Sequence, residues 1–412
     1  MIEQLEWPTG RAGRQTVLAQ FGEARAELMR WALTTGDELA DAVVTEMHEI
    51  GVKKARLLLR KGIREGSAAL ADPPPALAAL LRQAESRPDY VDDQLLDQAS
   101  MPFYTAPATV HLIALSAGAL IRVYESPSIS EVLTTTGRLV DGAQRRLQET
   151  GAWHRQVMIP GSLRAGQPGY VATLEVRMLH AHMRKLALDR GYDASVHGYP
   201  INQVDLGRTW MDFTLTGRTA EERLGFGSTN RETADLYRYW WYIAHLLGID
   251  ARLVEGITSN AAAQRIDDLF QTVTGPVTED SAALADATLA AVASTMHEVL
   301  KVPSGLARPA LNAITRRIHG DGLCRDLRIP ASRVADVWLG PALSGLAAAR
   351  ERRRRDARLW DAMIDRNLAA ARELLATPGH PTPYRHSAAG PDDRGISVAP
   401  RAAVGDPASP IE

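Results

Sequence analysis

The most informative pattern in the chain is Glu175-Val-Arg-Met-Leu-His-Ala-His-Met-Arg-Lys-Leu186. Arg177, His180 and Arg184 are spaced i, i+3, i+7, so on an α-helix they lie within roughly 60° of one another. A guanidinium cannot lose its proton in a protein, and its charge disfavours protonation of a nearby imidazole. The sequence therefore leaves two readings open. The neutral histidine faces an anionic, metal-containing group such as haem, or all three residues belong to a salt-bridge network between helices.

The same stretch has the apolar periodicity of a helix. Leu174, Met178, Leu179, Met183 and Leu186 recur at helical spacing and predict a helix over 171–190. Similar patterns continue outward in both directions, and no stretch shows the sustained alternation of a strand. The sequence therefore predicts an all-α fold. The other expected helices span 15–34, 37–50, 76–85, 109–124, 131–150 (ending at Gly151), 205–215, 230–248, 281–299, 308–318 and 331–376.

Composition excludes several classes of protein. The chain has 412 residues, 47 of them basic and 49 acidic, and a formal net charge of −2, which argues against nucleic-acid binding. Its one cysteine, Cys324, excludes an intramolecular disulfide framework and cysteine-clustered zinc or iron–sulfur sites. The N-terminal residues lack the pattern of a signal peptide, and the longest apolar run, 106–121, is too short to span a bilayer. We therefore expect a cytoplasmic protein without stable membrane insertion.

Two further clusters carry polar or aromatic residues in unusual density. The first, 198–213, contains Asn202, Gln203 and Asp205, which is more than one helix cap needs and is compatible with a polar network behind a site. The second, 237–249, is rich in tyrosine and tryptophan. Such an aromatic stripe is usual in a hydrophobic core, and it also suits the wall of a large planar cofactor pocket.

These three clusters, in this order, resemble the DUF2236 family, which includes MpaB-type oxygenases and rubber oxygenases of the latex clearing protein type. The residues that carry the resemblance are Arg177-x-x-His180-x-x-x-Arg184, then 200–206 with Thr209 and Phe213, then 239–249. The resemblance implies a single large helical domain with a globin-like core around haem b. It divides the chain into an N-terminal helical extension (1–84), a haem-binding oxygenase-like domain (85–376) and a tail (377–412) whose composition predicts disorder.

The resemblance also implies roles for individual residues. His180 would be the proximal iron ligand, with Arg177, Arg184, Asn202 and Asp205 as the other residues that bind the cofactor. The helix over 131–150 would cover the distal side, and the activity would be oxygen activation. Arg177, Thr135 and Thr136 are the expected catalytic residues, the two threonines as lining of an open distal position. The expected partners are O₂ and a small-molecule substrate, with no electron donor identifiable from the sequence.

The chain departs from the rubber oxygenases where these carry a distal lysine and a catalytic glutamate. No lysine occurs between Lys61 and Lys185, and no carboxylate occurs near 115–117. Together with the missing export signal, this predicts that the substrate is not rubber but a small apolar molecule, for example an isoprenoid or another secondary metabolite. Two alternatives stay open. The chain could be a non-catalytic helical haem- or ligand-binding protein, or it could hold a non-haem metal through His180 with Asp205 or His245.

Overall fold

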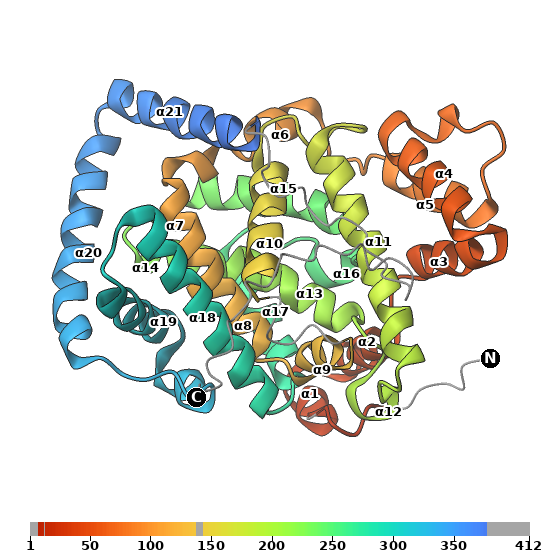
Figure 1. Ribbon diagram of the computed structural model, residues 1–412, viewed down its shortest axis with the longest axis horizontal. Coiled ribbons are helices and arrows are strands. Elements are labelled where there is room, and N and C mark those ends of the chain that lie inside the picture. The colour runs from red at the N-terminus through yellow and green to blue at the C-terminus, as the bar shows by residue number, and fades with distance from the viewer. Residues whose placement is uncertain (1–6, 12, 137–142, 377–412) are drawn as a thin grey trace, which may run out of the picture.

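The computed structural model describes residues 7–11, 13–136 and 143–376, and within these ranges the chain contains helices and no strands. The prediction of an all-α fold is therefore confirmed, and the described residues form a single helical domain (Figure 1). The segment 137–142 and the predicted disordered tail, 377–412, lie outside the described residues. The domain boundary expected at residues 84 and 85 stays a prediction.

The helices follow one another with short connections. In chain order they are α1 (Arg14–Phe21), α2 (Glu23–Thr34), α3 (Glu38–Ile50), α4 (Val52–Glu65), η1 (Ser67–Ala69), α5 (Pro75–Glu85), α6 (Asp93–Gln98), η2 (Met101–Thr105), α7 (Ala108–Ile113), η3 (Ala114–Leu120), α8 (Ile121–Tyr124), α9 (Pro127–Thr135), α10 (Ala143–Met158), α11 (Pro168–Asp189), α12 (Ala194–His197), α13 (Gln203–Met211), η4 (Asp212–Thr216), α14 (Gly217–Arg223), α15 (Asn230–Leu247), α16 (Ala251–Val254), α17 (Asn260–Thr272), α18 (Glu279–Leu300), α19 (Ser304–Asp326), α20 (Arg333–Arg354) and α21 (Ala357–Ala376).

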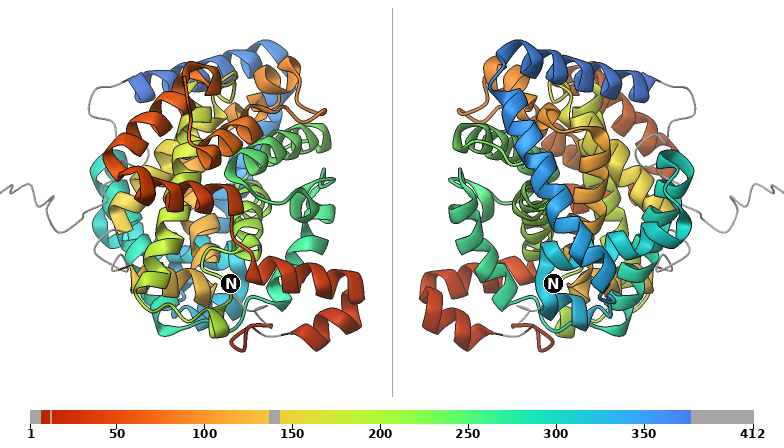
Figure 2. Two further views of the ribbon diagram at one scale, coloured as in Figure 1. Left: turned by 90° about the vertical axis from the view of Figure 1, so that its right-hand side faces the viewer. Right: turned by 90° about the vertical axis from the view of Figure 1, so that its left-hand side faces the viewer.

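Helix α11, which carries the arginine–histidine pattern, lies in the interior of the molecule. It packs against α3, α10 and α15, so three segments far apart in the sequence surround it. In Figure 1, α3 to α5 lie at one side of the molecule and α20 runs along the opposite side. Figure 2 shows α20 crossing its face of the molecule obliquely, and α21 lies across one end in both views.

Several helix boundaries differ from the sequence expectation, and three of them are informative. The helix expected over 15–34 breaks at Gly22, whose φ of 83° lies in the region that glycine adopts most easily. The expected helix over 331–376 is two helices, and Asp356 caps the second through the amides of Arg358 and Leu359. The expected helix over 131–150 also differs, because α9 ends at Thr135 and α10 runs through Gly151 to Met158. A glycine within a helix lowers its stability without having to end it.

Two π-helical segments, which are far apart in the sequence, are neighbours in the structure. η3 joins α7 to α8, and η4 joins α13 to α14, each without a break in the helical path. The segments pack against each other and against α14, where Gly118 allows a close approach. A Cβ atom at Gly118 would lie 2.9 Å from that of Ala220. π-helical turns shift the side chains that follow them and occur often at functional sites. This pair therefore indicates the region around Phe213 as a candidate site.

The apolar side chains gather in two large buried clusters. One contains residues from α2, α3, α5, α11 and α15, and the other contains residues from α7, η3, α18 and α19. No single helix in the described ranges is long and apolar enough to cross a membrane. The bent pair Asp93–Thr105 and Ala108–Tyr124 meets the length and composition criteria when its two parts are taken together.

Candidate functional site

An apolar cavity lies between α11 and the helices that pack around it. Most of its wall is hydrophobic, and α9, α10, α11 and α13 supply the larger part of it. We call this space the apolar cavity. Its lining includes Leu120, Val123, Tyr124, Ile129, Val132, Leu133, Thr136, Arg146, Glu149, Thr150, Trp153, Val176, Leu179, His180, Met183, Ile201, Asp205, Leu206, Thr209, Trp210, Phe213, Trp240, Leu247 and Ile249.

His180 is the titratable side chain that α11 contributes to the apolar cavity. It is flanked there by Val176, Leu179 and Met183, the neighbours on one face of the helix. Burial, and secondarily the charge of Arg184, lowers the pKa of His180 to about 4. The imidazole is therefore neutral at neutral pH. Its Nδ1 is buried without a hydrogen-bond partner among the described residues. Metal ligation by histidine requires a neutral ring, so His180 on this apolar wall is in a protonation state that permits it.

The arginines on either side of His180 are not part of the cavity lining, and aspartates near the N-terminus hold them. Arg177 is 2% exposed and forms a two-pronged ion pair with Asp37, with Nε–Oδ2 and Nη2–Oδ1 distances of 2.6 and 2.9 Å. Its Nη1 donates to Gln83 Oε1 at 2.6 Å. Arg184 is 1% exposed and donates from Nε to Asp41 Oδ1 at 2.7 Å. Neither arginine is part of the apolar cavity lining, and His180 lies at the border between the two faces of α11.

Gly248 shows how tightly the Arg177–Asp37 pair is enclosed. It ends α15 in the left-handed conformation, with φ 74° and ψ 25°, which favours glycine. A Cβ atom there would lie 2.4 Å from Asp37 Oδ2 and 2.7 Å from Arg177 Nε. The backbone of α15 therefore closes directly over the ion pair.

Asp205 borders the cavity and is the centre of a hydrogen-bond network. Its carboxylate accepts from Arg11 Nη2 at 2.8 and 3.0 Å, from Ser128 Oγ at 2.9 Å and from Asn202 Nδ2 at 3.0 Å. Asn202 also caps α13, because its Oδ1 accepts from the Asp205 amide at 3.0 Å. Asn202 and Asp205 thus lie together, as the high density of polar residues in 198–213 suggested. Arg11 and Ser128, which the sequence did not single out, join them.

The two expected catalytic threonines lie in different places. Thr136 borders the apolar cavity, and its hydroxyl donates to the Val132 carbonyl at 2.7 Å. Thr135 donates to Glu131 Oε1 at 3.0 Å and is not part of the cavity lining. The structure therefore brings His180, Asp205 and Thr136 to one cavity, and leaves Thr135, Asn202 and the two arginines outside its lining.

Glu149 is a carboxylate of the cavity wall that sequence reasoning missed. It is 9% exposed, lines the cavity from α10, and accepts from Arg145 Nε at 2.7 Å. The sequence expectation ended a helix at Gly151 and looked for a carboxylate near 115–117. Because α10 continues through Gly151, Glu149 and Trp153 lie one turn apart on the same helix and line the same cavity.

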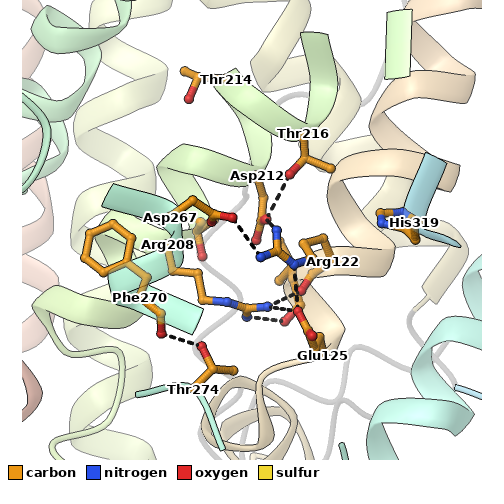
Figure 3. Close-up of polar contacts among 12 residues, drawn as sticks. Arg122, Glu125, Arg208, Asp212, Thr214, Thr216, Asp267, Phe270, Thr274 and His319 are labelled. Carbon is orange, nitrogen blue, oxygen red and sulfur yellow. Dashed lines mark hydrogen bonds and ion pairs between the residues drawn. The ribbon is translucent and has the colours of Figure 1, made fainter. Parts of the chain in front are cut away.

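A second charged cluster joins side chains from α8, α13, η4 and α17 and from Glu125, the residue that follows α8 (Figure 3). Arg122 contacts Glu125 at 2.7 Å, Asp267 at 3.0 Å and Asp212 at 3.6 Å, and Arg208 contacts Glu125 at 2.6 Å. Burial raises the pKa of Asp212 to about 7, and its Oδ2 has no hydrogen-bond partner within the described ranges. None of these five residues is part of the apolar cavity lining. The cluster therefore connects α8, α13, η4 and α17 by ion pairs and does not form the site.

The alternative of a non-haem metal site lacks a group of three side-chain ligands among the described residues. His245 lies elsewhere, where its ring nitrogens contact the side chain and carbonyl of Gln83. In the part of the chain that the structure describes, no three His, Cys, Asp or Glu side chains are grouped so that they could hold a metal ion.

Comparisons with known proteins agree with the helical architecture. A family model described as ER-bound oxygenase mpaB/B′/rubber oxygenase, catalytic domain, matches residues 106–352. The structure titled "Structure of Latex Clearing Protein LCP in the closed state" is similar, with a TM-score of 0.62 and 20% sequence identity over 82% of this chain and 90% of that one. At this identity the likeness concerns the fold. No curated protein sequence matches the chain. Because the family model covers more than half of the chain, the protein belongs to this family of oxygenase catalytic domains and is an oxidoreductase.

Proposed function

We propose that the protein is a haem-b-dependent oxygenase that activates O₂ on a small apolar substrate, with His180 as the iron ligand. The observation that carries the proposal is the state of His180. Its imidazole is neutral because its pKa is lowered to about 4, and its Nδ1 lacks a partner among the described residues. Core histidines normally satisfy both ring nitrogens or face water, because an unmade buried hydrogen bond costs about 1–3 kcal/mol.

The residues around the cavity fit a haem. Trp153, Trp210, Phe213 and Trp240 offer aromatic surface to a large planar group. Haem b also carries carboxylates, which call for cationic partners. Arg184 Nη2 and Arg11 Nη1 are buried guanidinium nitrogens without a hydrogen-bond partner in the described ranges. Their parent side chains contact Ile201 and Asp205, both of which border the cavity.

Haem b, when bound, supplies the redox chemistry that activates O₂ toward an organic substrate. The protein side chains then have distinct tasks. Asp37 and Asp41 hold Arg177 and Arg184, and thereby fix the rotation of α11 that presents His180 to the cavity. Arg177 acts in this way as a positioning residue. Among the expected catalytic residues Thr136 borders the cavity, and we add Glu149 as a group that can hold or move a proton there.

The cavity wall supports an apolar substrate, since most of its residues are hydrophobic. An isoprenoid or another apolar metabolite has this chemistry. O₂ is the second substrate. Membership of an oxygenase family favours this function over a non-catalytic binding protein.

A spectrum of the purified protein tests the proposal. The wild-type protein produced with haem precursor is expected to show a Soret band, and His180→Ala is expected to lose it while keeping the helical circular dichroism. His182→Ala is the matched control, since His182 lies on the same helix but outside the cavity lining. A wild-type protein without Soret absorbance after haem supplementation would contradict the proposal.

A further inference from the structure

Three hollows of the structure share walls and form a series from the surface to the apolar cavity. The outermost, which we call the cleft, has a volume of about 510 Å³ and lies between α10, α7 and α21. A narrow space of about 30 Å³ follows, which we call the constriction. The cleft and the constriction share Phe103, His111, Leu115 and His154. The constriction and the apolar cavity share Phe213 and Trp240.

His154 occupies the junction between the cleft and the constriction. Its ring lies among aromatic neighbours, with centroids 5.3 Å from Phe103, 5.7 Å from Phe213 and 5.8 Å from Trp240. Burial, and then the charge of His111, lowers the pKa of His154 to about 3, so the ring is neutral. A neutral imidazole offers one N–H donor and one nitrogen acceptor. No residue in the described ranges forms a hydrogen bond with His154.

The neighbouring histidine differs, because its hydrogen bonds are complete. His111 Nδ1 lies 2.7 Å from Glu221 Oε1, and its Nε2 lies 2.9 Å from the Phe103 carbonyl oxygen. Its ring stacks on Phe103 at a centroid distance of 3.6 Å. Both ring nitrogens of His111 are therefore occupied by partners within the wall. His154 is left as the imidazole whose nitrogens are free to meet a ligand.

We propose that the cleft under α21 is the entrance for the substrate, and that His154 binds an uncharged oxygen group of that substrate. The inference rests on the proposed function, because it supplies the apolar cavity with its substrate. The substrate class is an elongated apolar molecule with one hydroxyl or carbonyl group. Its reacting end passes Phe213 and Trp240 into the apolar cavity, its oxygen lies at His154, and its apolar tail lies in the cleft.

The wall of the cleft supports this class of substrate. Ala106, Leu112, Leu147, Ala371 and Leu374 provide apolar contact along it. Asn367 holds α21 in place by donating to the carbonyl oxygens of Tyr104 at 2.9 Å and Ala106 at 3.4 Å. Helix α21 follows the segment that the family model matches, which ends at residue 352. The outer part of the entrance is thus built by a helix beyond the matched oxygenase segment.

Ligand binding to the full-length protein tests the proposal. The probe is N-phenyl-1-naphthylamine, an uncharged apolar dye whose fluorescence rises on binding, and 1-decanol is the competitor. His154→Phe is expected to weaken 1-decanol binding about tenfold, the effect of one lost hydrogen bond of ~1.4 kcal/mol, while dye affinity changes less than twofold. Ala371→Trp fills the cleft and is expected to weaken both ligands at least tenfold. Ala370→Trp, at an exposed position of the same helix, is the matched control and leaves both unchanged.

Two outcomes overturn the proposal. Wild-type affinities in Ala371→Trp would show that the cleft is not the binding site. An unchanged ratio of 1-decanol to dye affinity in His154→Phe would remove the role of His154. In the haem-loaded protein, 1-decanol is also expected to shift the Soret band, and Ala371→Trp to abolish that shift. Absence of a Soret band in the wild type contradicts the proposed function instead, whatever the dye measurements show, so the two failures are distinguishable.

Discussion

At the scale of single residues, the sequence located the helix face of the site but not the partners of its charges. The spacing of Arg177, His180 and Arg184 indicated one shared face. It could not reveal that Asp37 and Asp41 neutralise the two arginines, because these contacts span more than a hundred residues of chain. The salt-bridge interpretation is confirmed for the two arginines, and the interpretation of His180 as a ligand stays a prediction. The arginines belong to salt bridges between helices, and His180 alone faces the cavity.

Replacing Arg177 tests the importance of the buried ion pair. We expect Arg177→Met to lower the free energy of unfolding by about 3–5 kcal/mol, because Asp37 would remain as a buried carboxylate without its partner. Urea denaturation measures the change. Arg64→Met is the control, since Arg64 is exposed and its nitrogen lies 3.9 Å from Glu175. Equal stabilities for the two variants would show that the Arg177–Asp37 pair contributes nothing.

The proposed role of His180 as the iron ligand predicts how haem binding depends on pH. The pKa of His180 is about 4 in the folded protein and about 6.5 in an unfolded chain, so the folded state favours the neutral ring. Its contribution to stability is present above pH 6.5 and is lost as the pH falls through 4. We expect the Soret band to be constant above pH 6.5 and to decline as the pH approaches 4, in a titration followed by absorbance. A band that declines upward from pH 7 would contradict the assignment.

At the scale of helices, the sequence predicted the existence of elements better than their ends. The apolar periodicity and the capping residues predicted the bounds of α11 and α15 closely. Thr229 forms the capping box with Glu232 at the start of α15. Gly151 misled the expectation, because a glycine can end a helix or lie within one, and only tertiary packing distinguishes the two. Glu149 lies within the predicted helix, and it was missed because the sequence alone does not show which face of α10 lines the cavity.

The π-helical segment η4 carries a carboxyl group with an unusual titration. The pKa of Asp212 is raised to about 7 by burial, above its ordinary value of 3.8, so its ionisation lowers stability as the pH rises from about 4 to 7. Asp212→Asn removes this loss. We therefore expect the free energy of unfolding of the variant to rise more steeply with pH across this window than that of the wild type. Thermal unfolding at several pH values measures the slope, and parallel curves would show that Asp212 is ionised throughout.

At the scale of the whole molecule, the all-α class was predictable from the absence of strand patterns, whereas the cavity was not. Its wall combines residues from α8 to α15, and a single sequence does not show which helices meet. The series of hollows that leads outward to α21 depends even more on tertiary packing, since it joins Phe103, His154 and Asn367 from distant parts of the chain.

The expression of residues 106–352 alone gives a prediction at this scale. This segment contains Arg177 and Arg184 but lacks Asp37 and Asp41. We expect it to be insoluble or loosely packed, because two buried guanidinium groups would have no counter-ion. Near-ultraviolet circular dichroism and limited proteolysis compare it with the full chain, and a compact, protease-resistant fragment would contradict the expectation.

Asp37 and Asp41 also limit which segments of this protein can be exchanged with a relative in a chimera. A chimera that transplants residues 106–352 would move the charges of α11 without the residues that balance them. Such a graft should also carry residues 37–41, or replace both arginines together. The smallest segment that can be transferred with the charges of its buried arginines paired therefore includes Asp37 and Asp41. It begins well before residue 106, where the oxygenase family match begins.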